Sequence, residues 1–86
     1  MDLKQIELKD TVEMMNSGDY KERFKAELHQ TGIRLGKLKF FVEKYENGEL
    51  DFTPTCSIEL LKNQIAAMNA YIGILYERAE IEQIDV

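Results

Sequence analysis

Apolar residues recur in two long stretches of the chain at alternating spacings of three and four, the period of one face of an α-helix. In the first stretch these positions are Phe24, Leu28, Thr31, Leu35, Leu38, Val42 and Tyr45, with Thr31 the one polar member. In the second they are Ile58, Leu61, Ile65, Met68, Ile72, Leu75 and Ala79. An antiparallel pairing that sets Tyr45 opposite Ile58 aligns the two sets in seven layers. We call these positions the seam, and the pattern predicts an all-α fold built on an antiparallel helical hairpin.

Capping residues set the expected ends of the elements. Asp10-Thr11-Val12-Glu13 has the form of a capping box and predicts a short helix to about residue 16, with Leu8, Val12 and Met15 on its buried side. Asp19 with Glu22 is a second such box, Asn47-Gly48 is a typical helix end, and Ser57 precedes the second apolar stretch. We therefore expect a single domain over residues 1–86, with the following parts: a lead-in and short helix at 1–18, a long helix at 19–47, a loop at 48–56, and a long helix at 57–83.

The second long helix carries more apolar surface than a two-helix hairpin can cover. Besides its seam it has an outer row, to which Leu60, Ala67, Ile74 and Ile81 belong. A helix that is apolar around most of its circumference has neighbours on several sides. We expect this row to be the interface of a homo-oligomer, which makes the protein a helical bundle of several chains.

Gly32 and Gly36 lie inside the first long helix, where each costs about 1 kcal/mol relative to alanine. In one interpretation the missing side chains leave space for a ligand or a partner helix. In the other, Gly32 accommodates the ring of Tyr71, which the pairing places opposite it.

Composition limits the possible partners. Of the 86 residues, 44% are hydrophobic and 31% charged, with a net charge of −5, so we expect a foldable, soluble chain without general affinity for nucleic acid or membrane. The charge is uneven, because residues 20–39 hold six basic and two acidic side chains and residues 76–86 hold one basic and four acidic. No apolar run approaches the roughly 20 residues needed to span a bilayer. The single cysteine and the absence of an apolar leader indicate the cytoplasm.

Residues that support catalysis are sparse. His29 is the only histidine and has no second ligand at helical spacing, so we expect no metal site and no cofactor. Cys56 stands at a helix start, where a capping or packing role is more common than a nucleophilic one. We expect a protein that is not an enzyme.

Basic residues along one side of the first long helix suggest a different chemistry. Arginine donates paired hydrogen bonds to phosphate, and tyrosine rings stack on bases. The candidate ligand-binding residues are Tyr20, Arg23, Arg34, Lys37, Tyr71 and Arg78. The alternative is that this stripe is a solvated or salt-bridged face beside the seam.

Three segments also resemble known sequences. These are the run from Asp19 to Glu27, the loop from Leu50 to Cys56, and Glu59-Leu60-Leu61-Lys62 with Gln64, Met68, Tyr71, Leu75 and Arg78. Together they resemble small helical proteins encoded by phages and prophages of Gram-positive bacteria, related to an uncharacterised crAss-like phage protein. In size and helical character the chain is also similar to phage cyclic-nucleotide sponge proteins, an analogy at the level of the fold.

The resemblance implies an accessory role against the host. Our first hypothesis is a non-enzymatic counter-defence protein, an oligomer that sequesters a small phosphate-bearing signal such as a cyclic nucleotide. The second is an adaptor or inhibitor that docks a host protein on the outer apolar row. A third, suggested by the helix–turn–helix outline of residues 11–25, is a DNA-binding regulator.

Overall fold

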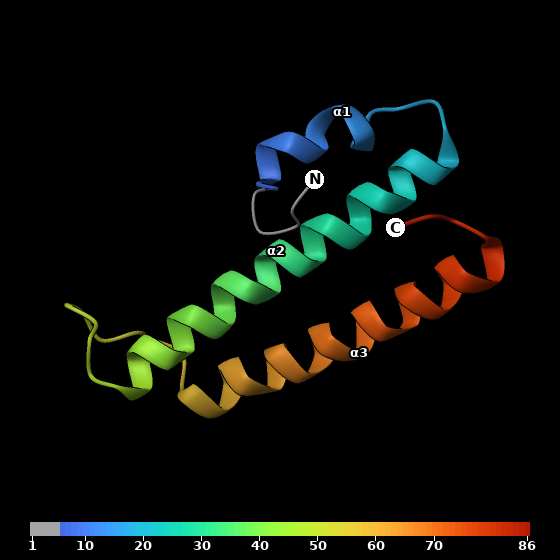
Figure 1. Ribbon diagram of the computed structural model, residues 1–86. Coiled ribbons are helices and arrows are strands. Elements are labelled where there is room, and N and C mark those ends of the chain that lie inside the picture. Colours follow the sequence, from blue (N-terminus) through green and yellow to red (C-terminus); the bar gives the residue numbers. More distant parts are fainter. Residues whose placement is uncertain (1–5) are drawn as a thin grey trace.

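A computed structural model describes residues 6–86 of the chain as an arrangement of helices without strands. A 3₁₀ helix η2 (Leu8–Thr11) leads directly into the short helix α1 (Val12–Met15), and the long helices α2 (Tyr20–Glu46) and α3 (Ile58–Glu82) follow (Figure 1). The predicted all-α class is therefore confirmed. The lead-in expected at the start of the chain lies in part outside the described residues.

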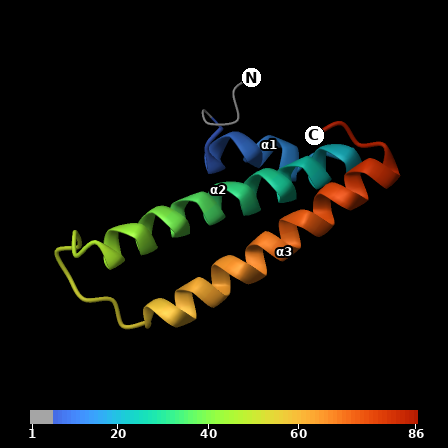
Figure 2. The same ribbon diagram turned by 60° about the horizontal axis from the view of Figure 1, so that its bottom comes forward.

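The two long helices lie antiparallel and side by side, as both ribbon views show (Figures 1 and 2). All fourteen seam side chains are buried or half-buried, so the predicted face is correct. Phe24, Leu28, Leu75 and Ala79 form the core together with Ile84, in the register expected from the sequence. Thr31 is accommodated in the seam because its hydroxyl donates to the Glu27 carbonyl at 2.7 Å.

Side-chain caps explain where the long helices begin. The Asp19 carboxylate accepts a hydrogen bond from the Lys21 amide at 3.0 Å, and the Ser57 hydroxyl accepts one from the Leu60 amide at 3.1 Å. Each bond satisfies one of the amides that a helix start leaves without an intrahelical partner.

The end of α3 directs the following residues back over the molecule. Gln83 adopts a left-handed conformation with φ 57°, and the Ile84 amide donates to the Ala79 carbonyl at 2.8 Å. This is the hydrogen-bond pattern of a Schellman motif, in which the residue after the turn packs against the last turn of the helix. Ile84 is consequently buried in the core.

The short amino-terminal helix differs from the expectation. Asp10 does not begin it, because its carboxylate accepts from the Glu7 amide at 2.9 Å inside a helical segment that starts earlier. Val12 and Met15 are exposed, so their predicted burial is wrong. Leu8 is half-buried, as predicted. The segment begins as a 3₁₀ helix with three residues per turn, and this period turns Thr11 and Met14 inward in place of Val12 and Met15.

A buried hydrogen bond fastens this segment to α2. Thr11 is fully buried, its hydroxyl donates to the Leu8 carbonyl at 2.7 Å, and the Gln30 amide nitrogen donates to that hydroxyl at 2.9 Å. The bond positions η2 and α1 along the first half of α2, on a side that α3 leaves uncovered (Figure 1).

Candidate functional site

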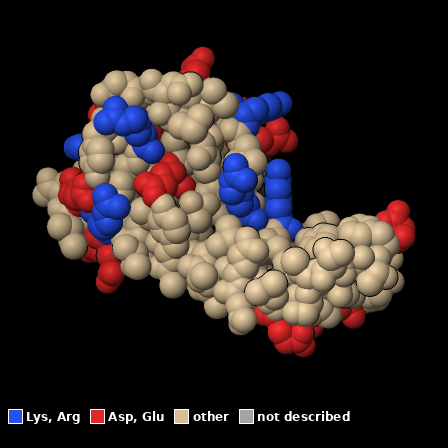
Figure 3. Space-filling view, turned by 180° about the vertical axis from the view of Figure 1, so that it is seen from behind, with Lys and Arg blue, Asp and Glu red and all other residues tan. Residues whose placement is uncertain are grey.

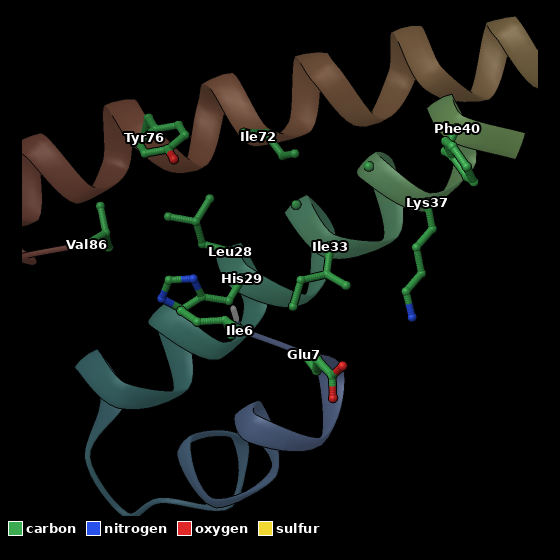
Figure 4. A pocket seen from close by; sticks show the side chains of 12 residues that line it. Ile6, Glu7, Leu28, His29, Ile33, Lys37, Phe40, Ile72, Tyr76 and Val86 are labelled. Carbon is green, nitrogen blue, oxygen red and sulfur yellow. The ribbon is translucent and has the colours of Figure 1, made fainter. Parts of the chain in front are cut away.

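A groove of about 670 Å³ lies where α2, α3 and the segment before η2 meet. Figure 4 shows the side chains that converge on it from these elements. The helix α2 supplies Leu28, His29, Gly32, Ile33, Gly36, Lys37 and Phe40. The remaining lining residues are Ile6, Glu7, Ile72, Tyr76 and Val86. Its volume is in the range of small-molecule sites, which are mostly apolar with a few polar groups.

Two glycines one helical turn apart form the floor of the groove. A Cβ atom added at Gly32 or at Gly36 would meet no atom of residues 6–86 within 4 Å, apart from its chain neighbours and the nearby backbone of its own helix. The interpretation that Gly32 accommodates the ring of Tyr71 is therefore wrong. The tyrosine of α3 that lines this space is Tyr76, because Tyr71 lies on another face of the helix. The open space instead supports the alternative, that the glycines leave room for a ligand or a partner helix.

Few polar groups line the groove, and they differ in charge. Partial burial, and secondarily the neighbouring Lys25, lowers the pKa of His29 below 6.5, so its imidazole is neutral at neutral pH. A neutral imidazole offers one donor and one acceptor. The Lys37 ammonium and the Glu7 carboxylate lie toward the opposite end of the groove (Figure 4). None of the ion pairs among residues 6–86 involves Lys37.

A second polar cluster closes the open end of the hairpin. The Tyr20 hydroxyl donates to the Glu82 carboxylate at 2.8 Å, and Arg78 donates to the same carboxylate at 3.2 Å and to the Tyr20 oxygen at 2.9 Å. The Arg78 guanidinium also lies 5.1 Å from the centre of the Phe24 ring. The hydrogen bond from Tyr20, followed by that from Arg78, lowers the pKa of Glu82. These contacts neutralise the charge of Arg78 within the chain.

The six predicted ligand residues do not gather at one place in the chain. The structure brings Tyr20 and Arg78 together in the open-end cluster and places Lys37 in the groove. Because Tyr20 and Lys37 are about 25 Å apart along α2, one small ligand cannot reach both on the same chain.

The other three predicted residues lie elsewhere. Arg23 donates to the Ser17 carbonyl at 2.8 Å and so holds the turn before α2. Arg34 and Tyr71 are exposed and line neither the groove nor the open-end cluster. Phe40 and His29 were not predicted as ligand residues, and the sequence signal for this part of the groove was the glycine pair.

The outer row of α3 faces away from α2. Leu60, Ile74 and Ile81 are 57%, 56% and 81% exposed, and Ala67 is exposed as well. These are the residues predicted to form an oligomer interface, and they remain exposed to solvent among residues 6–86. Exposed apolar surface of this extent is typical of an interaction site.

Charged side chains are intermixed over much of the molecule. Figure 3 shows Lys and Arg groups interspersed with Asp and Glu over its wider end, whereas the narrower end presents mainly uncharged atoms. No helix within residues 6–86 combines the length and the apolar character needed to cross a bilayer. In the same part of the chain, no three His, Cys, Asp or Glu side chains lie together as a metal site requires.

Comparison with known proteins gives one finding. Residues 18–81 match the family model described as Sequestin. No curated protein and no solved structure matches the chain significantly. The matched segment contains α2 and all but the last residue of α3. It covers about three-quarters of the sequence, so the chain belongs to the Sequestin family.

Proposed function

We propose that this member of the Sequestin family is a non-enzymatic binding protein that sequesters a small phosphate-bearing ligand, such as a cyclic nucleotide. The observation that carries the proposal is the family match over residues 18–81, because the family's name suggests sequestration. The groove over Gly32 and Gly36 is the ligand site that the geometry favours.

The shape and chemistry of the groove suit a planar ring joined to an anion. The glycine floor lets a flat ring lie directly on the backbone of α2, and the Tyr76 ring provides an aromatic wall. The neutral imidazole of His29 can hydrogen-bond to heteroatoms of such a ring. Lys37 supplies a cation for the phosphate.

The open-end cluster is the weaker candidate for phosphate binding. Arg78 already donates to Glu82 and Tyr20, and a phosphate would have to compete with that adjacent carboxylate. In the proposed function this cluster holds the ends of α2 and α3 together, and Lys37 is the predicted residue that meets the ligand.

The biological setting is part of the same proposal. Sequestering a nucleotide signal would serve a phage or prophage as counter-defence, in the cytoplasm of the host and with the protein acting as a homo-oligomer. The proposal gives the protein no catalytic step.

Isothermal titration calorimetry with a panel of cyclic nucleotides tests the ligand. Because a hydrogen bond to a charged group contributes about 1.5–3 kcal/mol, we expect Lys37→Ala to weaken binding about tenfold to a hundredfold. Lys39→Ala is the matched control, since Lys39 is two residues away and does not line the groove. No binding across the panel would refute the nucleotide proposal.

A second pair of variants tests the location. Gly32→Leu places a side chain on the floor of the groove and should abolish binding, while Gly32→Ala should reduce it less. Both variants should fold, because a Cβ at this position meets no side chain of residues 6–86 within 4 Å. If Gly32→Leu binds normally and Arg78→Leu does not, the ligand site is at the open-end cluster instead.

The exposed outer row of α3 supports a second candidate function, a helical adaptor or inhibitor that binds a host protein. In that case affinity capture from host lysate recovers a stoichiometric partner, and Ile74→Asp abolishes the capture. The sequestering protein is expected to recover only itself.

A further inference from the structure

The outer row of α3 has the spacing of a coiled-coil interface. Leu60, Ala67, Ile74 and Ile81 recur every seven residues. A strict seven-residue repeat keeps one face of a helix against a partner helix over several turns. Three of the four side chains are more than half exposed in the single chain, although α2 covers the opposite face of the same helix.

We propose that a second copy of this chain covers the outer row, with the two α3 helices antiparallel about a two-fold axis between Ala70 and Tyr71. This inference deepens the homo-oligomer of the proposed function by naming its interface and its register. It does not depend on which ligand is bound.

The sizes of the side chains favour the antiparallel register. It places Leu60 against the partner's Ile81, and Ala67 against the partner's Ile74, so that a small residue meets a large one in the inner layers. A parallel register would place two alanines together in one layer and two isoleucines in the next. Cores pack best when large and small residues alternate across the contact. The small side chain of Ala70 lets the two helices approach closely at the axis.

The polar residues that flank the row are compatible with the same register. Antiparallel pairing brings Gln64 opposite the partner's Arg78, and Asn63 opposite the partner's Glu77. Both are hydrogen-bonding combinations, because the amide oxygen accepts from the guanidinium and the amide nitrogen donates to the carboxylate.

The dimer leaves the groove open. Ile72 and Tyr76 line the groove from the side of α3 that faces α2, whereas the outer row lies on the far side of the helix. The proposed dimer therefore presents two separate grooves, one in each copy. Loss of the dimer and loss of ligand binding can then be observed independently.

Light scattering coupled to gel filtration tests the interface. The unaltered protein should be a dimer, and Ile74→Asp should be a monomer with an unchanged helical circular dichroism spectrum. Asn69→Asp is the matched control, since it adds the same carboxylate on an exposed face of α3 outside the row. A monomeric unaltered protein, or an Ile74→Asp variant that remains dimeric, would overturn the proposal. Ligand binding that persists in the Ile74→Asp monomer shows that the groove acts without the dimer.

Disulfide cross-linking in a Cys56→Ser background tests the register. A mixture of Leu60→Cys and Ile81→Cys proteins should form the mixed disulfide, while Leu60→Cys alone should not cross-link. The antiparallel register separates the two copies of residue 60 by about 30 Å, because position 60 faces the partner's position 81, which is 21 helical steps away. A disulfide between two copies of Leu60→Cys would establish the parallel register and overturn this one.

Discussion

At the open end of the hairpin, Leu75 is only 1% exposed, and Phe24 and Ala79 are buried beside it under Ile84. At the closed end Val42 is also buried, but the other three seam residues there, Ile58, Leu61 and Tyr45, remain half-exposed. The same helices and the same periodic pattern thus give two different degrees of burial.

The difference comes from the third layer. Two helices in contact bury only the strip along which they meet, and the sides of each strip stay accessible. At the open end, Ile84 turns back over the seam, and α1 covers a further face of α2 (Figure 2). At the closed end only the loop is near, where Phe52 stacks obliquely on Phe41 with ring centres 6.2 Å apart but stays exposed. The cluster of buried core residues therefore lies at the open end.

The largest difference in free energy of unfolding is expected between two leucine truncations, one at each end of the hairpin. Leu75→Ala leaves a cavity in a closed environment and should lower the free energy of unfolding by about 2–5 kcal/mol. Leu61→Ala, its counterpart at the closed end, should cost much less because the site is already half-exposed. Urea denaturation followed by circular dichroism measures both. Equal losses would show that the two ends contribute alike.

A smaller effect is expected from the buried hydrogen bond that fastens α1. Thr11→Val keeps the shape of the side chain but leaves the Gln30 amide without its hydroxyl acceptor, and should cost about 1–3 kcal/mol. The control is Thr53→Val in the exposed loop of the closed end, which should leave the unfolding midpoint unchanged. If Thr11→Val leaves the free energy of unfolding unchanged, α1 contributes little to the stability of the open end.

The turn that brings Ile84 into the core can be improved. Gln83→Gly should stabilise the protein by about 0.5–1 kcal/mol, because glycine adopts the left-handed conformation at φ 57° without steric cost. Gln64→Gly in the middle of the same helix should destabilise it by about 1 kcal/mol. Thermal unfolding should show a higher melting temperature for Gln83→Gly and a lower one for Gln64→Gly. A loss of stability in Gln83→Gly would contradict the role of the turn.

The smallest effect is the pH dependence of the open end. Hydrogen bonds from Tyr20 and Arg78 lower the pKa of Glu82 below 4.5, so the folded state binds this proton less readily than the unfolded state. The stabilisation from Glu82 is therefore fully present above the pKa of the unfolded state, and it is lost as the pH falls through the lower pKa of the folded state. Unfolding midpoints measured across this range should fall less in Glu82→Gln than in the unaltered protein. Glu46→Gln, which removes the exposed pair with Lys62 at the closed end, is the control.

Much of the fold could be predicted because it depends on periodicity along single helices. The seam positions, the caps at Asp19 and Ser57, and the uncovered outer row of α3 all follow from patterns within one segment. The 3₁₀ turn at Leu8–Thr11 could not be predicted in the same way, since a short segment fits a period of 3.0 or 3.6 equally well. Because of that ambiguity, Val12 and Met15 were wrongly predicted to be buried.

The site was less accessible to prediction because it is formed by three segments at once. The missing side chains of Gly32 and Gly36 indicated an open space beside the helix. The pairing of positions along the seam, however, predicted Tyr71 as the residue opposite Gly32. The structure places Tyr76 there, because the groove lies beside the seam rather than across it. In the same way, basic side chains that share a stripe in the sequence separate in space, with Lys37 in the groove and Arg23 bound to a turn.

The sequence by itself determined the two long helices, their antiparallel register and the apolar faces they carry, because these properties arise from local propensity and from the helical period. Only the tertiary structure decided which end of the hairpin is closed by a third layer and where an open space remains. Those features depend on the contacts that Ile84 and Thr11 make with residues far away in the chain. No periodic pattern in the sequence specifies these contacts.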